Sequence, residues 1–191
     1  MMRLKSITLI CVLISQCPII GYAQRFLPEY NLKRDNLLSN KVELIIEYEF
    51  LQQGIIFIQE NVEDCFSYSP LYLFWIENGN FYKQKFTECQ TSPIMKLTYS
   101  DFLDLASKNL IKIKNAKILA AKSNNVTEVY VSHDDEWIFK FHSDNNNFEK
   151  VISDFSLNTR MLEENEPNLN YWVNQNSILK KLIDLVSAET D

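Results

Sequence analysis

The chain of 191 residues has two histidines, His133 and His142, as its imidazole groups. His133 precedes Asp134, Asp135 and Glu136, so this run offers one nitrogen and several oxygens to a divalent cation, or a base with carboxylates to orient it. A small hydrolase using His133 is one hypothesis, although no nucleophile with a known signature accompanies it. The simpler interpretation is a polar hairpin turn, because aspartate is favoured where a chain reverses. We adopt the turn and predict no catalytic residue, no metal and no cofactor.

Other polar residues could also do chemistry. The run HSDNNN at 142–147 has oxygen ligands but lacks the glycine and the spacing of a calcium loop, so we expect a solvated loop. Carboxylate pairs at 47/49, 63/64 and 163/164 are of the kind that hydrolyses glycosidic bonds. The alternation of residues 43–49, however, places Glu43, Glu47 and Glu49 on the wet face of a strand.

Composition excludes several function classes. Beyond residue 23 the chain has only Gly54 and Gly79, too few for a glycine-rich phosphate loop, and it has no GxSxG nucleophile elbow. The whole chain carries 19 basic and 25 acidic residues, a net charge of −6. Phosphate backbones repel such a chain, and the lysines between 108 and 122 are diluted by apolar residues. We therefore predict no nucleic-acid partner.

Residues 1–23 have the pattern of a secretory signal peptide: an early basic stretch, an apolar core from Ile7 to Ile14, and small residues at 21 and 23. We expect cleavage after Ala23 and export to the periplasm or the exterior. No later stretch is apolar enough to span a bilayer, so we predict no transmembrane segment after signal removal. Lipid anchoring at Cys17 is less favoured because Gln16 precedes it, and tethering by an uncut signal is less favoured too.

An exported chain with two remaining cysteines suggests one disulfide, between Cys65 and Cys89. These residues flank a predicted hairpin, which would bring them close after a bend near Pro70. Two separate buried thiols are the alternative.

That hairpin joins residues 71–76 to 81–86 around Asn78-Gly79, a dipeptide that accepts the positive φ angles of a type I′ turn. One face carries Leu71, Leu73, Trp75, Tyr82 and Phe86, which we expect to be core. The other face mixes aromatics with lysines, and it is either covered by a helix or forms a binding patch. Its members are Tyr72, Phe74, Ile76, Phe81, Lys83 and Lys85.

The remaining chain suggests a single α+β domain at 41–191 after an irregular N-terminal arm at 24–40. Strands are predicted at 42–50, 55–59 and 111–121, and a second hairpin at 128–132 and 137–141 with Tyr130, Trp137, Phe139 and Phe141 buried. Helices are predicted at 98–110 with Thr98 as N-cap, at 148–155, and at 169–187 with an acidic linker before it. Leu169, Trp172 and Val173 are expected on the apolar side of the last helix. Tight turns between strands favour an antiparallel sheet with packed helices.

Two segments, YLFWIENGNFYKQKFTEC at 72–89 and LNYWVNQNSILKKL at 169–182, resemble parts of small exported bacterial proteins of uncharacterised function. The resemblance implies no activity and no site residues.

These observations favour an exported, non-catalytic binding or interaction module of the cell envelope, with a protein partner and in one form an inhibitor or immunity-type protein. Acidic charge would steer it to a basic partner. The alternative is a carrier of a small apolar ligand, which would need an unfilled apolar pocket.

Overall fold

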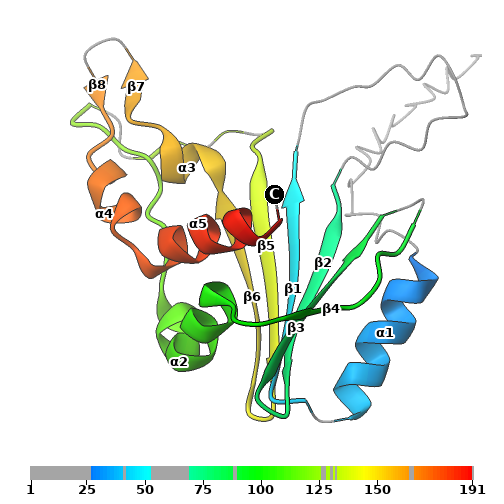
Figure 1. Cartoon of the computed structure of the whole chain (residues 1–191). Coiled ribbons are helices and arrows are strands. Elements are labelled where there is room, and N and C mark those ends of the chain that lie inside the picture. Colours follow the sequence, from blue (N-terminus) through cyan, green and yellow to red (C-terminus); the bar gives the residue numbers. More distant parts are fainter. Residues whose placement is uncertain are drawn as a thin grey trace, which may run out of the picture.

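A computed structural model describes residues 27–40, 42–52, 69–87, 90–125, 128–129, 131, 133–163 and 166–190. It confirms an α+β fold with an antiparallel sheet (Figure 1). The signal peptide, the strand at 55–59, Tyr130 and the disulfide between Cys65 and Cys89 lie outside the described residues and stay predictions.

The described residues form a sheet of order β4-β3-β2-β1-β5-β6, in which every neighbouring pair is antiparallel. Its strands are β1 (Leu44–Leu51), β2 (Leu71–Glu77), β3 (Asn80–Phe86), β4 (Met95–Leu97), β5 (Glu136–Ser143) and β6 (Asn146–Ser153). A separate ribbon pairs β7 (Met161–Glu163) with β8 (Glu166–Pro167). The helices are α1 (Pro28–Ser39), α2 (Asp101–Asn115), α3 (Asp154–Asn158), α4 (Tyr171–Gln175) and α5 (Ile178–Thr190).

The first predicted hairpin is confirmed in position and register. Leu71 lies opposite Phe86, and the turn residues Asn78 and Gly79 have φ angles of 51° and 70°. The Gly79 N–H donates to the carboxylate of Glu43, the residue before β1, at 2.8 Å, and this contact holds the turn in place.

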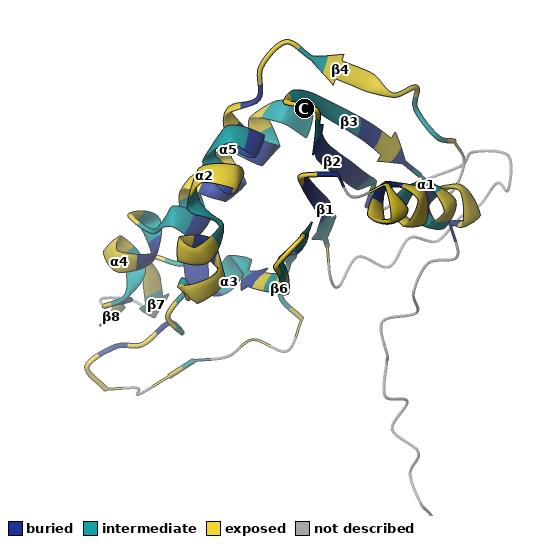
Figure 2. Ribbon diagram, turned by 90° about the horizontal axis from the view of Figure 1, so that it is seen from below, coloured by how far each residue is buried: buried dark blue, intermediate teal, exposed yellow. Residues whose placement is uncertain are grey.

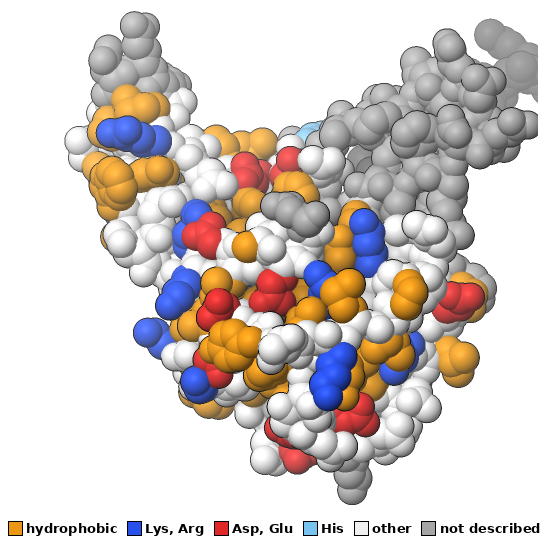
Figure 3. Space-filling view, in the orientation of Figure 1, with side chains coloured by type: hydrophobic (Ala, Val, Ile, Leu, Met, Phe, Trp, Pro, Cys, Tyr) orange, Lys and Arg blue, Asp and Glu red, His pale blue; other side chains and the backbone are white. Residues whose placement is uncertain are grey.

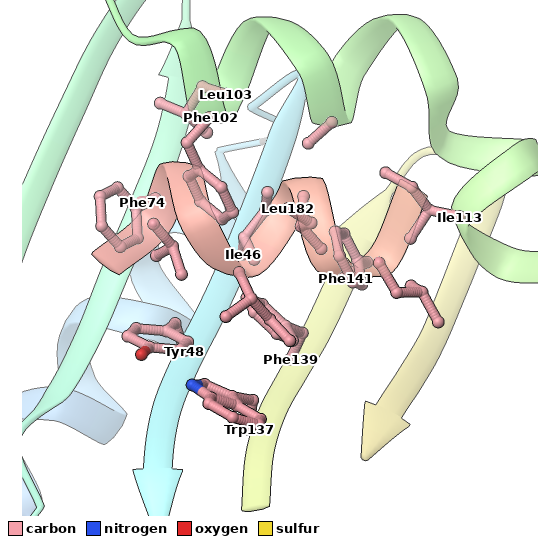
Figure 4. Packing of buried hydrophobic residues seen from close by; sticks show 14 of the residues in the cluster. Ile46, Tyr48, Phe74, Phe102, Leu103, Ile113, Trp137, Phe139, Phe141 and Leu182 are labelled. Atoms are coloured by element: carbon pink, nitrogen blue, oxygen red, sulfur yellow. The ribbon is translucent and has the colours of Figure 1, made fainter. Parts of the chain in front are cut away.

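The main core lies between the sheet and α2, α3 and α5 (Figures 1 and 4). Rings from neighbouring strands and helices meet there, as in the edge contact of Phe74 with Phe102 at 4.9 Å between centroids. Tyr72, Phe74 and Ile76 are buried in this core, so the helix-covered alternative holds and these three residues form no surface patch.

The opposite face of the sheet carries α1, where the sequence predicted an irregular arm (Figure 2). The prediction of the arm is wrong because α1 has few apolar residues and its helical periodicity is weak. Pro28 stands in the first turn, where its missing N–H costs nothing. Tyr30 and Leu37 are buried against Ile45, Leu73 and Trp75 of the sheet.

The predicted second hairpin is also wrong. The strand at 137–141 exists as β5, with Trp137, Phe139 and Phe141 buried as expected. Its partner is β6, reached through a turn at 144–145, whereas the sequence predicted a loop and a helix there. Both HDDE at 133–136 and HSDNNN at 142–147 consist of residues that favour turns. The sequence pattern predicted the hairpin turn in the first segment, and the structure has it in the second.

Two helix predictions need correction. Helix α2 runs on to Asn115 and so covers the first part of the strand predicted at 111–121, of which only Ala121 makes a β-bridge. The N-cap of α2 is Ser100, whose Oγ accepts from the Leu103 N–H at 3.0 Å, in place of Thr98. The predicted closing helix is divided into α4 and α5 by a turn at Asn176-Ser177. The predicted acidic linker contains β7 and β8.

Candidate functional site

The chemically most distinctive cluster joins Tyr30, Glu47 and His142. Glu47, in β1, is 5% exposed. One carboxylate oxygen accepts a hydrogen bond from the Tyr30 hydroxyl of α1, and the other lies 2.6 Å from Nε2 of His142 in β5. The sequence predicted that Glu47 would lie on the solvent-exposed face of its strand and that His142 would lie in a loop, and both predictions are wrong. The alternation of β1 is correct, but α1 covers the face on which Glu47 lies.

A carboxylate that orients an imidazole is the second half of a nucleophile-activating triad. A hydrolase would also need a cleft beside this pair. Two hollows among the described residues, of about 410 and 580 Å³, are open at the surface, and neither is lined by Tyr30, Glu47 or His142. The cluster joins α1 to the sheet through the charge-assisted hydrogen bond from Tyr30 to Glu47. The buried carboxylate of Glu47 is thereby paired on both of its oxygens.

The run at 133–136 has a structural role through Asp134. Its carboxylate accepts from the Phe155 N–H at 2.9 Å and from the Ser153 hydroxyl, so it caps the start of α3. Burial, together with the charges of Asp134 and Asp135, raises the pKa of Asp154. A hollow of about 580 Å³ is lined by Asp134 and Glu136 but not by His133. No group of three or more His, Cys, Asp or Glu within the described chain is arranged to hold a metal ion.

The rest of the predicted hairpin patch lies at the rim of the core. Phe81 packs its edge against Tyr99 at 5.9 Å, and the Lys83 ammonium donates to the Glu189 carbonyl oxygen of α5. Lys85 is exposed, with its ammonium 5.7 Å from the Tyr72 ring. Three of the six patch residues are thus core, and the other three do not form a continuous aromatic surface.

The sequence analysis missed a set of exposed apolar residues on β7, on α4 and just before α4. We call it the lobe surface, and its members are Met161, Leu169, Trp172 and Val173. Trp172 is 63% exposed and Val173 58% exposed, although both were expected to face the core. The Arg160 guanidinium lies 5.8 Å from the Trp172 ring, and the Tyr171 ring packs edge-on at 4.9 Å. Figure 3 shows hydrophobic side chains gathered around a basic one at this end of the molecule.

Amide side chains fix the backbone that carries the lobe surface. Asn174 is 1% exposed, donates to the carbonyl oxygens of Leu119 at 2.8 Å and Ser156 at 2.9 Å, and accepts from the Leu119 N–H at 2.9 Å. Asn168 is buried as well, donates to Thr159 O at 2.9 Å and accepts from the Asn170 N–H at 3.0 Å. Fully paired amides of this kind fix the backbone, so α4 presents Trp172 from a rigid support.

Comparison of the chain with known protein families, curated proteins and solved structures finds no match. No helix in the described part of the chain is both long and apolar enough to cross a membrane.

One feature of the sequence could have indicated that the lobe surface is exposed. The segment NLNYWVNQN at 168–176 has five amide residues among nine, and two of them, Asn168 and Asn174, are buried. Amides at this density interrupt a helix, because they bond to nearby backbone groups. The interruption rotates Trp172 and Val173 away from the core face that α5 keeps.

Proposed function

We propose that this protein is an exported, non-catalytic protein-interaction module of the cell envelope or its surroundings, which binds its partner through the lobe surface. The observation that carries the proposal is the exposure of Trp172 beside Arg160 and Tyr171. Tryptophan, tyrosine and arginine are the residue types that most often dominate binding energy at protein interfaces.

Preorganisation supports the same conclusion. Binding loses affinity when loops and side chains must become ordered, and the buried amides of Asn168 and Asn174 have already fixed this segment. A net charge of −6 favours a partner with a basic surface and disfavours an anionic lipid surface. An inhibitor or immunity-type protein that occludes a basic partner is the concrete form we favour.

The carrier alternative receives less support from the geometry. A small apolar ligand needs an enclosed apolar pocket. The hollows of about 410 and 580 Å³ among the described residues are open and combine apolar with charged lining residues, such as Leu97 with Lys96 and Leu119 with Glu128.

The proposal is tested by purifying the protein, tagged at its C-terminus, from envelope and medium fractions of its own host. Partners are identified by mass spectrometry for the wild type, for Trp172→Ala and for Leu32→Ala. Leu32 is the matched control because it is 75% exposed on α1, away from the lobe. We expect one stoichiometric protein that is lost with Trp172→Ala alone. A monomer without partners in all three preparations would contradict the proposal and direct attention to bound small molecules.

A further inference from the structure

A second surface, on β4, lies apart from the lobe. In Figure 2, β4 forms the outer margin of the molecule beside β3 and is coloured as exposed, while α4 lies at the opposite end. Ile94, the residue before β4, is 51% exposed, and Met95, the first residue of β4, is 52% exposed. An uncovered edge strand presents unpaired N–H and C=O groups, which natural proteins usually protect.

The hairpin register determines which backbone groups of this edge point outward. In a hairpin with a two-residue turn, Glu77 and Asn80 are the first hydrogen-bonded pair, so residues 81, 83 and 85 turn their backbone groups toward β4. The Ser92 N–H accordingly donates to the Lys85 carbonyl oxygen at 2.9 Å. Phe81 pairs with Leu97 and Lys83 with Met95, which turns the N–H and C=O of Ile94 and Lys96 outward.

We propose that an extended segment of a partner protein adds to the sheet alongside β4, pairs with the backbone of Ile94 and Lys96, and places an acidic side chain beside Lys96. Strand addition supplies affinity through the main chain and specificity through alternate side chains. Lys96 is exposed and shares the face of its partner Tyr82, whereas Lys85 lies on the other face of the sheet over the Tyr72 ring. Lys96 therefore gives this edge a positive charge within an acidic chain. A hollow of about 410 Å³, lined by Phe81, Leu97 and Thr98 among others, offers room for an apolar side chain of the added strand.

Two features disfavour a second copy of this chain as the added strand. Antiparallel pairing through Ile94 and Lys96 would set the two Lys96 side chains opposite or diagonal to each other, and like charges there are destabilising. Each copy also carries a net charge of −6. Pro93 has no N–H, so the added strand is confined to the residues after it. This inference concerns a surface distinct from the lobe and does not depend on the function proposed for it.

The test uses a displayed library of random 12-residue peptides, selected on the chain that begins at Gln24. We expect enriched peptides in which apolar residues alternate with Asp or Glu. A synthetic copy of an enriched peptide should bind to the Lys96→Gln and Ile94→Pro variants at least about tenfold more weakly than to the wild type. The loss of one charge-assisted contact or of one backbone hydrogen bond accounts for a change of that size. N-methylation of alternate peptide bonds in the synthetic copy should weaken binding likewise.

The variants are chosen to keep the sheet intact. Ile94→Pro removes an outward N–H and no bond to β3, and Ile94→Ala controls for its side chain. Trp172→Ala should bind the peptide as the wild type does, which separates this surface from the lobe. The inference is overturned if no peptide is enriched, if Ile94→Pro and Ile94→Ala bind it equally, or if sedimentation shows a dimer that Ile94→Pro dissociates.

Discussion

The hydroxyl of Tyr30 donates a hydrogen bond to the carboxylate of Glu47, and this contact links α1 to the central strand of the sheet. The other oxygen of the Glu47 carboxylate lies 2.6 Å from Nε2 of His142. The sheet therefore has a main core under α2 and α5 and a smaller one under α1, and the second depends on a polar contact as well as on Leu37 and Trp75.

Replacing Tyr30 with Phe should lower the free energy of unfolding by about 1–2 kcal/mol, because a buried carboxylate loses one of its donors. Urea denaturation measures the change, and hydrogen exchange should become faster in residues 28–39. Tyr82→Phe is the control, since Tyr82 contributes its ring by stacking on Trp75 at 5.3 Å. Equal stability of Tyr30→Phe and wild type would show that the contact does not hold α1.

Replacing Phe74 with Ala should cost about 3–5 kcal/mol, because the residue is fully buried between β2 and α2 and its removal leaves a cavity. Val151→Ala, on the exposed side of β6, should change stability by no more than about 0.5 kcal/mol. Thermal or urea unfolding of both variants checks the difference. A folded, undestabilised Phe74→Ala protein would restore the binding-patch interpretation of the hairpin.

Asp154 should make stability depend on pH. Burial and the charges of Asp134 and Asp135 raise its pKa in the folded state, so the ionised form opposes folding. That cost is present above the folded pKa and disappears as the pH falls through the ordinary range of an aspartate. Asp154→Asn should therefore be more stable than wild type at pH 7, with a gain that vanishes near pH 3. Unfolding curves at both pH values test this, and a gain that grows on acidification would contradict it.

The disulfide between Cys65 and Cys89 stays a prediction from the sequence. A free-thiol assay on the exported protein under denaturing conditions should detect no reactive thiol before reduction and two after it. Reduction should lower stability by roughly 3 kcal/mol, as the chain-entropy model gives for a loop of this size. Two reactive thiols before reduction would show that the cysteines do not pair.

The sequence predicted what depends on local patterns. Asn78-Gly79 specifies a turn by itself, so the turn and the register of the β2–β3 hairpin are correct, and each strand is one residue longer than predicted. The alternation of Trp137, Phe139 and Phe141 identifies β5 for the same reason. What failed depends on contacts distant in sequence. Nothing near Glu47 indicates that Tyr30 and His142 will meet it, 17 and 95 residues away.

The lobe surface was missed for a related reason. Trp172 and Val173 have helical spacing relative to Leu179 and Val186, which predicts one buried stripe. The break at Asn176-Ser177 separates them, and it is stabilised by bonds from Asn174 and Gln175 to the α3 residues Ser156 and Leu157. The hydrophobic periodicity of residues 169–187 cannot indicate a helix break that depends on acceptors so distant in the sequence.

The central claim is that the lobe surface binds a protein partner, and site-specific photo-crosslinking tests it most directly. A photoreactive phenylalanine analogue would be placed at position 173 and, separately, at position 32, each exposed and apolar in the native chain. After irradiation of the host cells, we expect one discrete adduct from position 173 and none from position 32. Absence of an adduct at 173 under conditions where the protein is folded and exported, or the same adduct from both positions, would contradict the claim.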